Sequence, residues 1–147
     1  MKEYRFEGNF YYYVRLIKRL YENTLLEAAQ KVGLTLPEAD VLCFLRENPE
    51  FDTARDVALY RDVSRAYVSK AVELLAEKDY LAIRQDKNDR RLQHLEITNK
   101  ATQVAETLHK AQFEFYDTVT MNLSQDEITE MLRLIGKCAM NLEENSN

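Results

Sequence analysis

Residues 64–98 read SRAYVSKAVELLAEKDYLAIRQDKNDRRLQHLEIT, and the hydrophobic period of this stretch changes near its middle. At first, apolar residues recur every three or four positions behind Ser64, a residue type that caps helix N-termini. Two short runs, 80–84 and 92–97, then alternate apolar with polar side chains. The stretch therefore predicts a helix followed by a β-hairpin. The buried face of the hairpin is expected to consist of Leu81, Ile83, Leu95 and Ile97.

The loop of this hairpin, DKNDRR at residues 86–91, carries the adjacent arginines Arg90 and Arg91. Aspartate and asparagine tolerate the backbone geometry of a tight turn, but a turn has no need of two guanidinium groups. The two arginines therefore indicate a partner outside the fold.

The residues before this stretch predict three further helices. Apolar residues at helical spacing between residues 8 and 33 predict a long first helix. Thr35 and the glutamate three residues later are typical of a capping box that opens a second helix. A short helix opens at Thr53, and a break near Asp62 separates it from the helix behind Ser64. Two short helices separated by a tight turn predict a helix-turn-helix.

After the hairpin, helical spacing returns from Thr98 onward, and SQDE at 124–127 predicts a capping box that opens the last helix. Asp79, one of the few residue types that accept a left-handed cap, is expected to end the helix behind Ser64. The inward face of the last helix is expected to consist of Ile128, Met131, Leu132, Ile135, Ala139 and Leu142.

These elements predict a mainly α fold with a small β-hairpin wing, in one domain over residues 1–147. Residues 34–97 form the predicted winged helix-turn-helix, a DNA-binding arrangement. Residues 7–31 and 98–144 supply helices with more apolar surface than one copy of this extended plan would cover, so we expect a homodimer.

Composition narrows the classes of function. The 147 residues are 46% hydrophobic, enough for a core, and their formal net charge is -5. Residues 53–94 nevertheless hold nine basic against seven acidic side chains. Charge distribution matters more than the sum for a protein that binds nucleic acid locally. No apolar run approaches the length of a membrane span and no signal peptide is evident, so we expect a soluble, cytoplasmic protein without membrane contact.

Each part of a winged helix has a physical use on double-stranded DNA. The second helix of the helix-turn-helix presents its N-terminal side chains to the major groove, and the wing reaches the minor groove, whose potential attracts arginine. Arg91 is the residue we expect to insert, with Asp89 holding its guanidinium in a bidentate pair. The full set of expected DNA contacts is Ser64, Arg65, Tyr67, Lys70, Arg84, Asp89, Arg90 and Arg91.

At these residues the chain resembles the MarR family of transcriptional regulators, and the resemblance covers essentially the whole chain. The wing pattern of that family is matched here by Asp86, Asp89 and Arg91, then Ile97, Thr98 and Lys100. VSRAYVSKAVELL is similar to the family's recognition helix, and LTLPEADVLCFL to the segment before it.

The sequence also departs from the pattern of the family at several positions. Asn88 and Ile83 stand where arginines are usual, and Asp79 and Ala101 replace common glycines. Arg61 falls where a buried leucine is usual. The resemblance still implies a homodimer that binds a near-palindromic operator, acting as a repressor relieved by a small ligand.

The resemblance further implies a small aromatic or anionic effector between the dimerisation helices and the winged helix. Tyr11, Tyr12, Tyr13 and Tyr21 are the candidate lining, and core or dimer packing is the alternative use of these rings.

Other kinds of site find little support in the sequence. No cofactor motif and no catalytic grouping has the required spacing, so we expect no enzymatic activity and no cofactor. His94 and His109 are too few for a metal site even with Glu106 beside His109. Cys43 and Cys138 lie in apolar segments and are expected to be reduced core thiols.

One competing class remains open. The acidic total and the missing wing arginines are compatible with a dimeric winged-helix module that binds a protein and no specific DNA. Such a module would lack the salt-dependent DNA binding that phosphate contacts produce.

Overall fold

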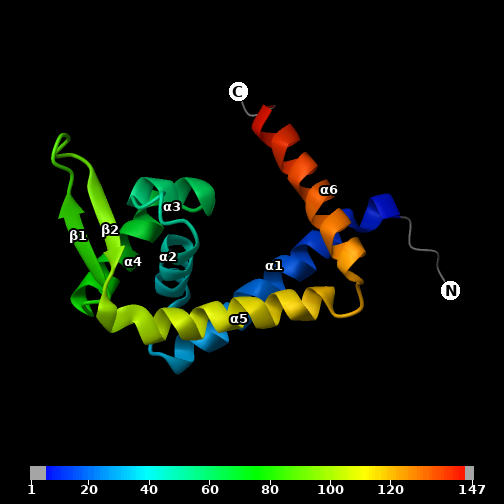
Figure 1. Ribbon diagram of the computed structural model, residues 1–147, viewed down its shortest axis with the longest axis horizontal. Helices are drawn as coiled ribbons and strands as arrows, with labels where there is room; N and C mark the ends of the chain where they lie inside the picture. The colour runs from blue at the N-terminus through cyan, green and yellow to red at the C-terminus, as the bar shows by residue number, and fades with distance from the viewer. Residues whose placement is uncertain (1–5, 145–147) are drawn as a thin grey trace. The chain divides into compact units, whose positions relative to one another are not determined.

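The computed structural model describes residues 6–144 of the chain (Figure 1). The chain divides into two compact units, one ending at Phe115 and the other beginning at Tyr116. The elements are α1 (Phe6–Lys31), α2 (Leu36–Glu47), α3 (Ala54–Tyr60), α4 (Arg65–Glu77), β1 (Leu81–Gln85), β2 (Gln93–Ile97), a 3-10 turn (Asn99–Ala101), α5 (Thr102–Thr120) and α6 (Gln125–Glu144). This order confirms the predicted fold class, mainly α with a small two-stranded wing.

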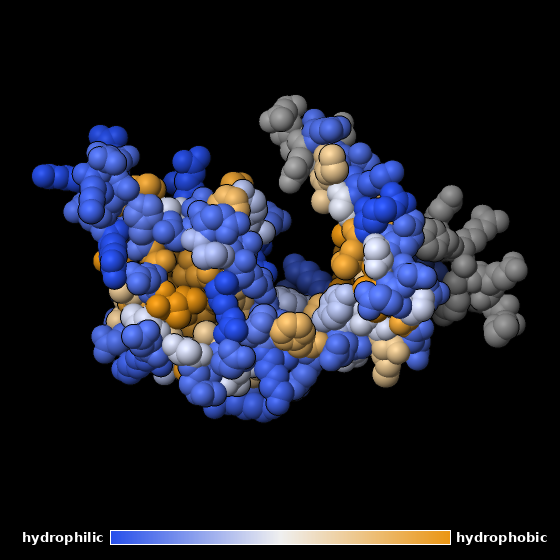
Figure 2. Space-filling model, viewed as in Figure 1, coloured by the Kyte–Doolittle hydropathy of each residue, from blue (hydrophilic) through white to orange (hydrophobic). Residues whose placement is uncertain are grey.

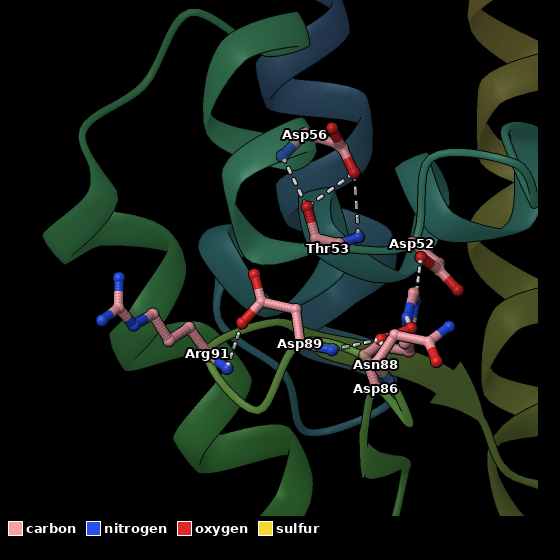
Figure 3. Close-up of polar contacts among 8 residues, drawn as sticks. Asp52, Thr53, Asp56, Asp86, Asn88, Asp89 and Arg91 are labelled. Atoms are coloured by element: carbon pink, nitrogen blue, oxygen red, sulfur yellow. Dashed lines mark hydrogen bonds and ion pairs between the residues drawn. The ribbon is translucent and has the colours of Figure 1, made fainter.

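Capping boxes begin α2 and α3. At α2, the Thr35 N–H donates to the Glu38 carboxylate at 2.8 Å, and the Thr35 hydroxyl accepts the Glu38 N–H. At α3, the Thr53 N–H donates to Asp56 Oδ2 at 3.1 Å, and the Thr53 hydroxyl accepts the Asp56 N–H at 3.2 Å (Figure 3). Each box satisfies backbone donors that a helix start leaves without partners, which fixes where these helices begin.

Two aspartates in the left-handed region end α3 and α4. Asp62 has φ 52° and Asp79 has φ 58°. The first produces the predicted break between the helices, and the second confirms the predicted left-handed cap. The Thr98 hydroxyl donates to the Asp79 carbonyl at 2.6 Å, so the end of α4 is also held to the segment that leads into α5.

The core of the first unit is built from side chains of α1 to α5 and the hairpin. Its largest fully buried side chains are Leu25, Leu42, Leu75, Leu108, Glu38, Val41, Val57 and Val68. Leu25 and Ala28 in the second half of α1 take part, whereas Phe10, Val14 and Ile17 in the first half are exposed. The amphipathic pattern of α1 therefore continues beyond the surface that this unit covers.

An ion pair connects the start of α2 with the end of α4. The Glu38 side chain is fully buried, and Lys78 Nζ donates to its carboxylate. Burial by itself would raise the pKa of Glu38, but the hydrogen bonds from Lys78 and Thr35 outweigh it and lower the pKa below its usual value. The charged carboxylate thereby holds the start of α2 to the end of α4.

Arg61, which stands where the MarR pattern has a buried leucine, is held by α2. Its guanidinium lies 3.5 Å from Asp40 Oδ1 and 3.4 Å from Glu47 Oε2, and it covers the Phe44 ring at 5.6 Å. Its long side chain packs on apolar surface, while its guanidinium forms ion pairs with two carboxylates. The turn after α3 is therefore packed through an ionic contact.

The wing is an antiparallel pair in which Leu81 faces Ile97 and Ile83 faces Leu95. Leu81 and Leu95 are buried as predicted and Ile97 is half-buried, but Ile83 is 43% exposed, so its predicted burial is wrong. The physical reason is that Ile83 borders an open groove of about 440 Å³ beside Val72 and Ala76 of α4, so its side chain is only partly covered.

In the second unit, the predicted capping box begins α6, because the Ser124 N–H donates to Glu127 Oε2 at 2.7 Å. Figure 2 shows hydrophobic residues gathered along one side of this helix. Ile128 and Met131 of the expected inward face are half-buried, but the rest of this face is exposed, and Ile135, for example, is 57% exposed. The large apolar side chains exposed on α6 are Leu132, Leu134, Ile135, Met140 and Leu142.

The two cysteines differ in environment. Cys43 is buried in α2 as predicted, and burial raises the pKa of its thiol to about 12. Cys138 is exposed on α6, so the prediction of a second core thiol is wrong. The apolar residues around Cys138 form a helix face that this chain by itself does not cover. Within residues 6–144, no helix is long and apolar enough to cross a membrane.

Candidate nucleic-acid interface

The N-terminus of α4 is arranged by Ser64, whose hydroxyl accepts the Tyr67 N–H at 3.1 Å. This cap orients the first turn of the helix, where the remaining N–H groups favour an anion such as a phosphate. Arg65 is exposed at this turn, and Tyr67 is half-buried and packed against the core. Because Tyr67 is half-buried, only part of its ring is available to a partner, and the same burial raises the pKa of its hydroxyl.

A groove of about 390 Å³ lies between the start of α3, the outer face of α4 and the wing. Its lining consists of Ala54, Arg55, Arg65, Ser69, Asp89, Arg91 and Leu92. Three guanidinium-bearing residues therefore face one aspartate, and the groove has an excess of positive charge. The fold brings Arg65 of α4 and Arg91 of the wing to the same groove, although they are far apart in the sequence.

Arg55 and Ser69 were not among the predicted DNA contacts. Arg55 follows the cap of α3 by two positions, and Ser69 lies one turn beyond Arg65 on the exposed face of α4. Helical spacing from Arg65 could have pointed to Ser69. No signal in the sequence places Arg55 beside the wing, because the distance between Arg55 and the wing depends on how α3 crosses α4.

The basic side chains of the region fall into two groups. Lys70 is paired with Glu73 at 3.0 Å, and Arg84 with Glu96 at 2.8 Å. For the second group, no carboxylate among the described residues lies within 4 Å. This group consists of Arg55, Arg65, Lys87, Arg90 and Arg91.

The wing turn is organised by Asp86. Its Oδ1 accepts the backbone N–H groups of Asn88 at 2.7 Å and Asp89 at 2.8 Å, and its Oδ2 lies 3.1 Å from His94 Nε2. The backbone donors and the imidazole hold the pKa of Asp86 down at about 2. The Gln85 side chain closes the loop by donating to the Arg90 carbonyl at 2.7 Å.

The predicted ion pair between Asp89 and the Arg91 guanidinium is not formed. Asp89 Oδ1 instead accepts the backbone N–H of Arg91 at 2.9 Å, and Figure 3 shows the guanidinium pointing away from the carboxylate. A residue two positions after an aspartate in a turn offers its N–H within easy reach, and this local bond replaces the bidentate pair. The Arg91 guanidinium therefore lies in the groove without a carboxylate partner.

Strand β2 of the wing is fastened to the loop between α2 and α3. His94 Nδ1 lies 2.8 Å from Asp52 Oδ1, and the Leu95 N–H donates to the Asp52 carbonyl at 2.7 Å. The hydrogen bonds with Asp52 and then with Asp86 raise the pKa of His94 above its ordinary value of 6.5. Within residues 6–144 no group of three or more His, Cys, Asp or Glu side chains has an arrangement that could hold a metal ion.

The four tyrosines that the sequence suggested as an effector lining lie in two different environments. Tyr11, Tyr12 and Tyr13 are exposed in the first half of α1, and Tyr12 borders a shallow groove there. Tyr21 is half-buried, lies 5.3 Å from the Phe115 ring centroid, and accepts a hydrogen bond from Gln112 at 3.4 Å.

Several solved structures have a fold similar to that of this chain. The DNA complex of MepR from S. aureus aligns with 94% of this chain and 99% of its own, at 19% identity and a TM-score of 0.77. BpsR from Bordetella bronchiseptica, whose DNA binding is regulated by 6-hydroxynicotinic acid, aligns with 92% of this chain and 96% of its own, at 20% identity and a TM-score of 0.71. A MarR protein from Peptoclostridium difficile aligns with 99% and 93%, at 21% identity and a TM-score of 0.80. No curated protein matches the chain.

A helix-turn-helix that continues into a hairpin, with basic side chains on the second helix and the hairpin loop, defines a winged helix-turn-helix protein. Residues 32–92, which hold nearly all of this region, match the sequence model of the MarR family. Over these residues the chain is similar to the MarR family of winged-helix transcriptional regulators.

Proposed function

We propose that this chain acts as a homodimer that binds a near-palindromic operator in DNA and represses transcription until a small ligand releases it. In this proposal residues 34–97 read the DNA, and residues 7–31 and 98–144 provide the dimer contacts. The broad function in this proposal, DNA-binding regulation of transcription, is supported by the match of residues 32–92 to the MarR family model and by the likeness to the DNA complex of MepR. The operator, the sign of regulation and the ligand are the proposed part.

The observation that carries the proposal is the groove between α4 and the wing. Arg55, Arg65 and Arg91 line it, and none of them has a described carboxylate within 4 Å. Leaving three such charges unneutralised beside one another is unfavourable in the free protein, and a phosphate backbone would relieve it. Entry of α4 into the major groove would place Arg91 of the wing near the flanking minor groove.

The individual side chains suit different contacts. Arg65, at the first turn of α4, suits a contact with a guanine edge or a phosphate. Ser64 and Tyr67 suit contacts with the DNA next to the Arg65 contact. Lys70 and Arg84 must exchange a glutamate partner for DNA, so we assign them secondary, phosphate-directed roles. Asp89 shapes the loop through its contact with the Arg91 N–H, whereas Arg90 is directed to the backbone of the DNA.

Dimer formation is supported by apolar surface outside the winged helix. The first half of α1 and one side of α6 carry many large exposed hydrophobic side chains. Large apolar side chains exposed along a helix are typical of an interaction site, and two-fold pairing of DNA-reading units matches a near-palindromic site. The small-ligand part of the proposal is supported by the likeness to BpsR.

The test is selection of bound duplexes from a random library, followed by affinity measurements on the selected site against salt concentration. We expect a two-fold symmetric site whose affinity falls steeply with salt. The absence of any enriched sequence, together with binding that does not respond to salt, would favour the protein-interaction module instead. The net charge of -5 and the asparagine at position 88 are the observations that would then gain weight.

A further inference from the structure

His94 of β2 is held between two aspartates that belong to different parts of the first unit. Asp52, in the loop between α2 and α3, lies 2.8 Å from its Nδ1, and Asp86, in the wing turn, lies 3.1 Å from its Nε2. Figure 3 shows these two aspartates approaching the same region from separate segments. One imidazole therefore links the body of the winged helix to the turn of the wing.

The two contacts together require the charged form of the ring. An ionised carboxylate only accepts hydrogen bonds, and aspartates are ionised above about pH 5. A neutral imidazole has a single N–H and can donate to one of the two aspartates, whereas an imidazolium donates to both. Loss of the proton therefore breaks one of the two links.

The link leads directly to the arginine in the groove. Asp86, besides facing His94, accepts the N–H groups of Asn88 and Asp89, and Asp89 in turn accepts the N–H of Arg91. The position of the turn that carries Arg91 therefore depends on where Asp86 is held. We propose that His94 is a positioning residue for DNA binding, which fastens the wing in its DNA-reading position when protonated and loosens it when neutral.

This inference rests on the proposed DNA binding, but its geometry stands independently. His94 borders a groove between the α2–α3 loop and the wing. The charged side chains that line this groove are Asp52 from the α2–α3 loop, Arg84 from β1, Asp86 and Lys87 from the wing turn, and Glu96 from β2. Arg84 is neutralised by Glu96 at 2.8 Å, so Lys87 is the one cation of this set without a described partner. The two aspartates that touch the ring therefore decide the direction in which the pKa of His94 shifts.

The direction of this pKa shift fixes the pH range over which the link is present. The pKa of His94 in the folded protein is raised above 6.5, mainly by Asp52 and then by Asp86. The contribution of the link is thus complete below pH 6.5 and is lost as pH rises through the raised pKa. With its pKa near 2, Asp86 stays charged throughout this range.

The first experiment follows the ring by NMR in the full chain without DNA. The chain has two histidines, so the His109→Gln variant assigns the His94 signals. We expect His94 to titrate above 6.5, and to move back toward 6.5 in Asp52→Asn. The backbone amides of Asn88 and Arg91 should become more mobile above the His94 pKa. A ring that titrates at or below 6.5, or wing amides that do not respond, would overturn the inference.

The second experiment measures DNA affinity between pH 5.5 and 8.5 at constant ionic strength on the selected site. We expect the wild type and His109→Gln to lose affinity by about fivefold as pH rises through the His94 pKa. His94→Gln, which cannot titrate, should bind at the weaker level at every pH, and circular dichroism at each pH checks that it is folded. If His94→Gln keeps the wild-type profile, His94 does not position the wing.

The two experiments separate the inference from the proposed function. DNA binding by all variants with an ordinary His94 titration would leave the function standing and refute the inference. A raised His94 pKa with mobile wing amides, but no DNA binding by any variant at any pH, would instead refute the proposed function and with it the role of His94 in DNA binding.

Discussion

Replacing Arg91 by alanine removes one charge from the groove without disturbing the wing. The exposed guanidinium has no described carboxylate within 4 Å, and the contact of Arg91 with Asp89 runs through the backbone N–H, which alanine retains. We therefore expect the free energy of unfolding to change by less than about 0.5 kcal/mol. Any larger effect of the substitution should appear only in the presence of DNA.

The magnitude follows from the number of cations that have no protein partner. The winged helix holds five of them, Arg55, Arg65, Lys87, Arg90 and Arg91, within the described part of the chain. Each phosphate neutralised contributes about 0.9 to the slope of log affinity against log salt. Five per protomer therefore give a slope of about 4.5, or about 9 for a dimer, before any contribution from Lys70 and Arg84. Arg91→Ala should reduce the slope of the dimer by about 2 and weaken binding by about 1–3 kcal/mol.

Fluorescence anisotropy of a labelled operator duplex, recorded between about 50 and 200 mM salt, measures both quantities. Arg19→Ala, an exposed arginine of α1 outside the winged helix, is the matched control and should leave the slope unchanged. If Arg91→Ala and Arg19→Ala give the same slope and affinity as the wild type, Arg91 does not contact DNA. If both reduce the slope equally, the response is to net charge, and the groove has no special role.

Three further predictions concern the fold that carries the groove. Arg61→Ala leaves two carboxylates beside α2 without their cation and uncovers an aromatic ring, so chemical denaturation should show a loss of about 1–3 kcal/mol. Asp79→Val places a β-branched residue at φ 58° and should destabilise the chain by about 1–2 kcal/mol in the same assay, whereas Asp79→Gly should cost less than about 1 kcal/mol. Equal losses for both would refute the backbone argument. Truncation after Asn122 removes α6 and should give a monomer or an insoluble chain by light scattering; a soluble dimer would contradict the proposed dimer contacts.

Local rules read from the sequence were sufficient for the starts of α2, α3 and α4, the end of α4 and the wing. Thr35, Thr53 and Ser64 cap helices where their side chains can satisfy backbone donors within three residues, and this chemistry does not depend on distant parts of the chain. Asp79 ends α4 for an equally local reason. The MarR pattern, which consists of such short motifs, was recognisable for the same reason.

Contacts between distant segments were decided by the tertiary structure. The sequence suggested that Asp89 holds the Arg91 guanidinium, but the turn geometry brings the backbone N–H to Asp89 first. It also suggested burial of Ile83, which depends on how closely β1 packs against α4. Periodicity predicts that a residue lies on an apolar face, as with Cys138, but whether that face is covered depends on what packs against it.

The sequence by itself therefore determined the order of elements, the caps, the positive charge of the loop at residues 86–91 and the resemblance to the MarR family. Only the tertiary structure placed Arg55 beside Arg91 and set His94 between Asp52 and Asp86. The physical reason is range. Capping and periodicity act over a few residues and are written in neighbouring letters, whereas a groove or a bridging imidazole depends on where separate helices and strands cross.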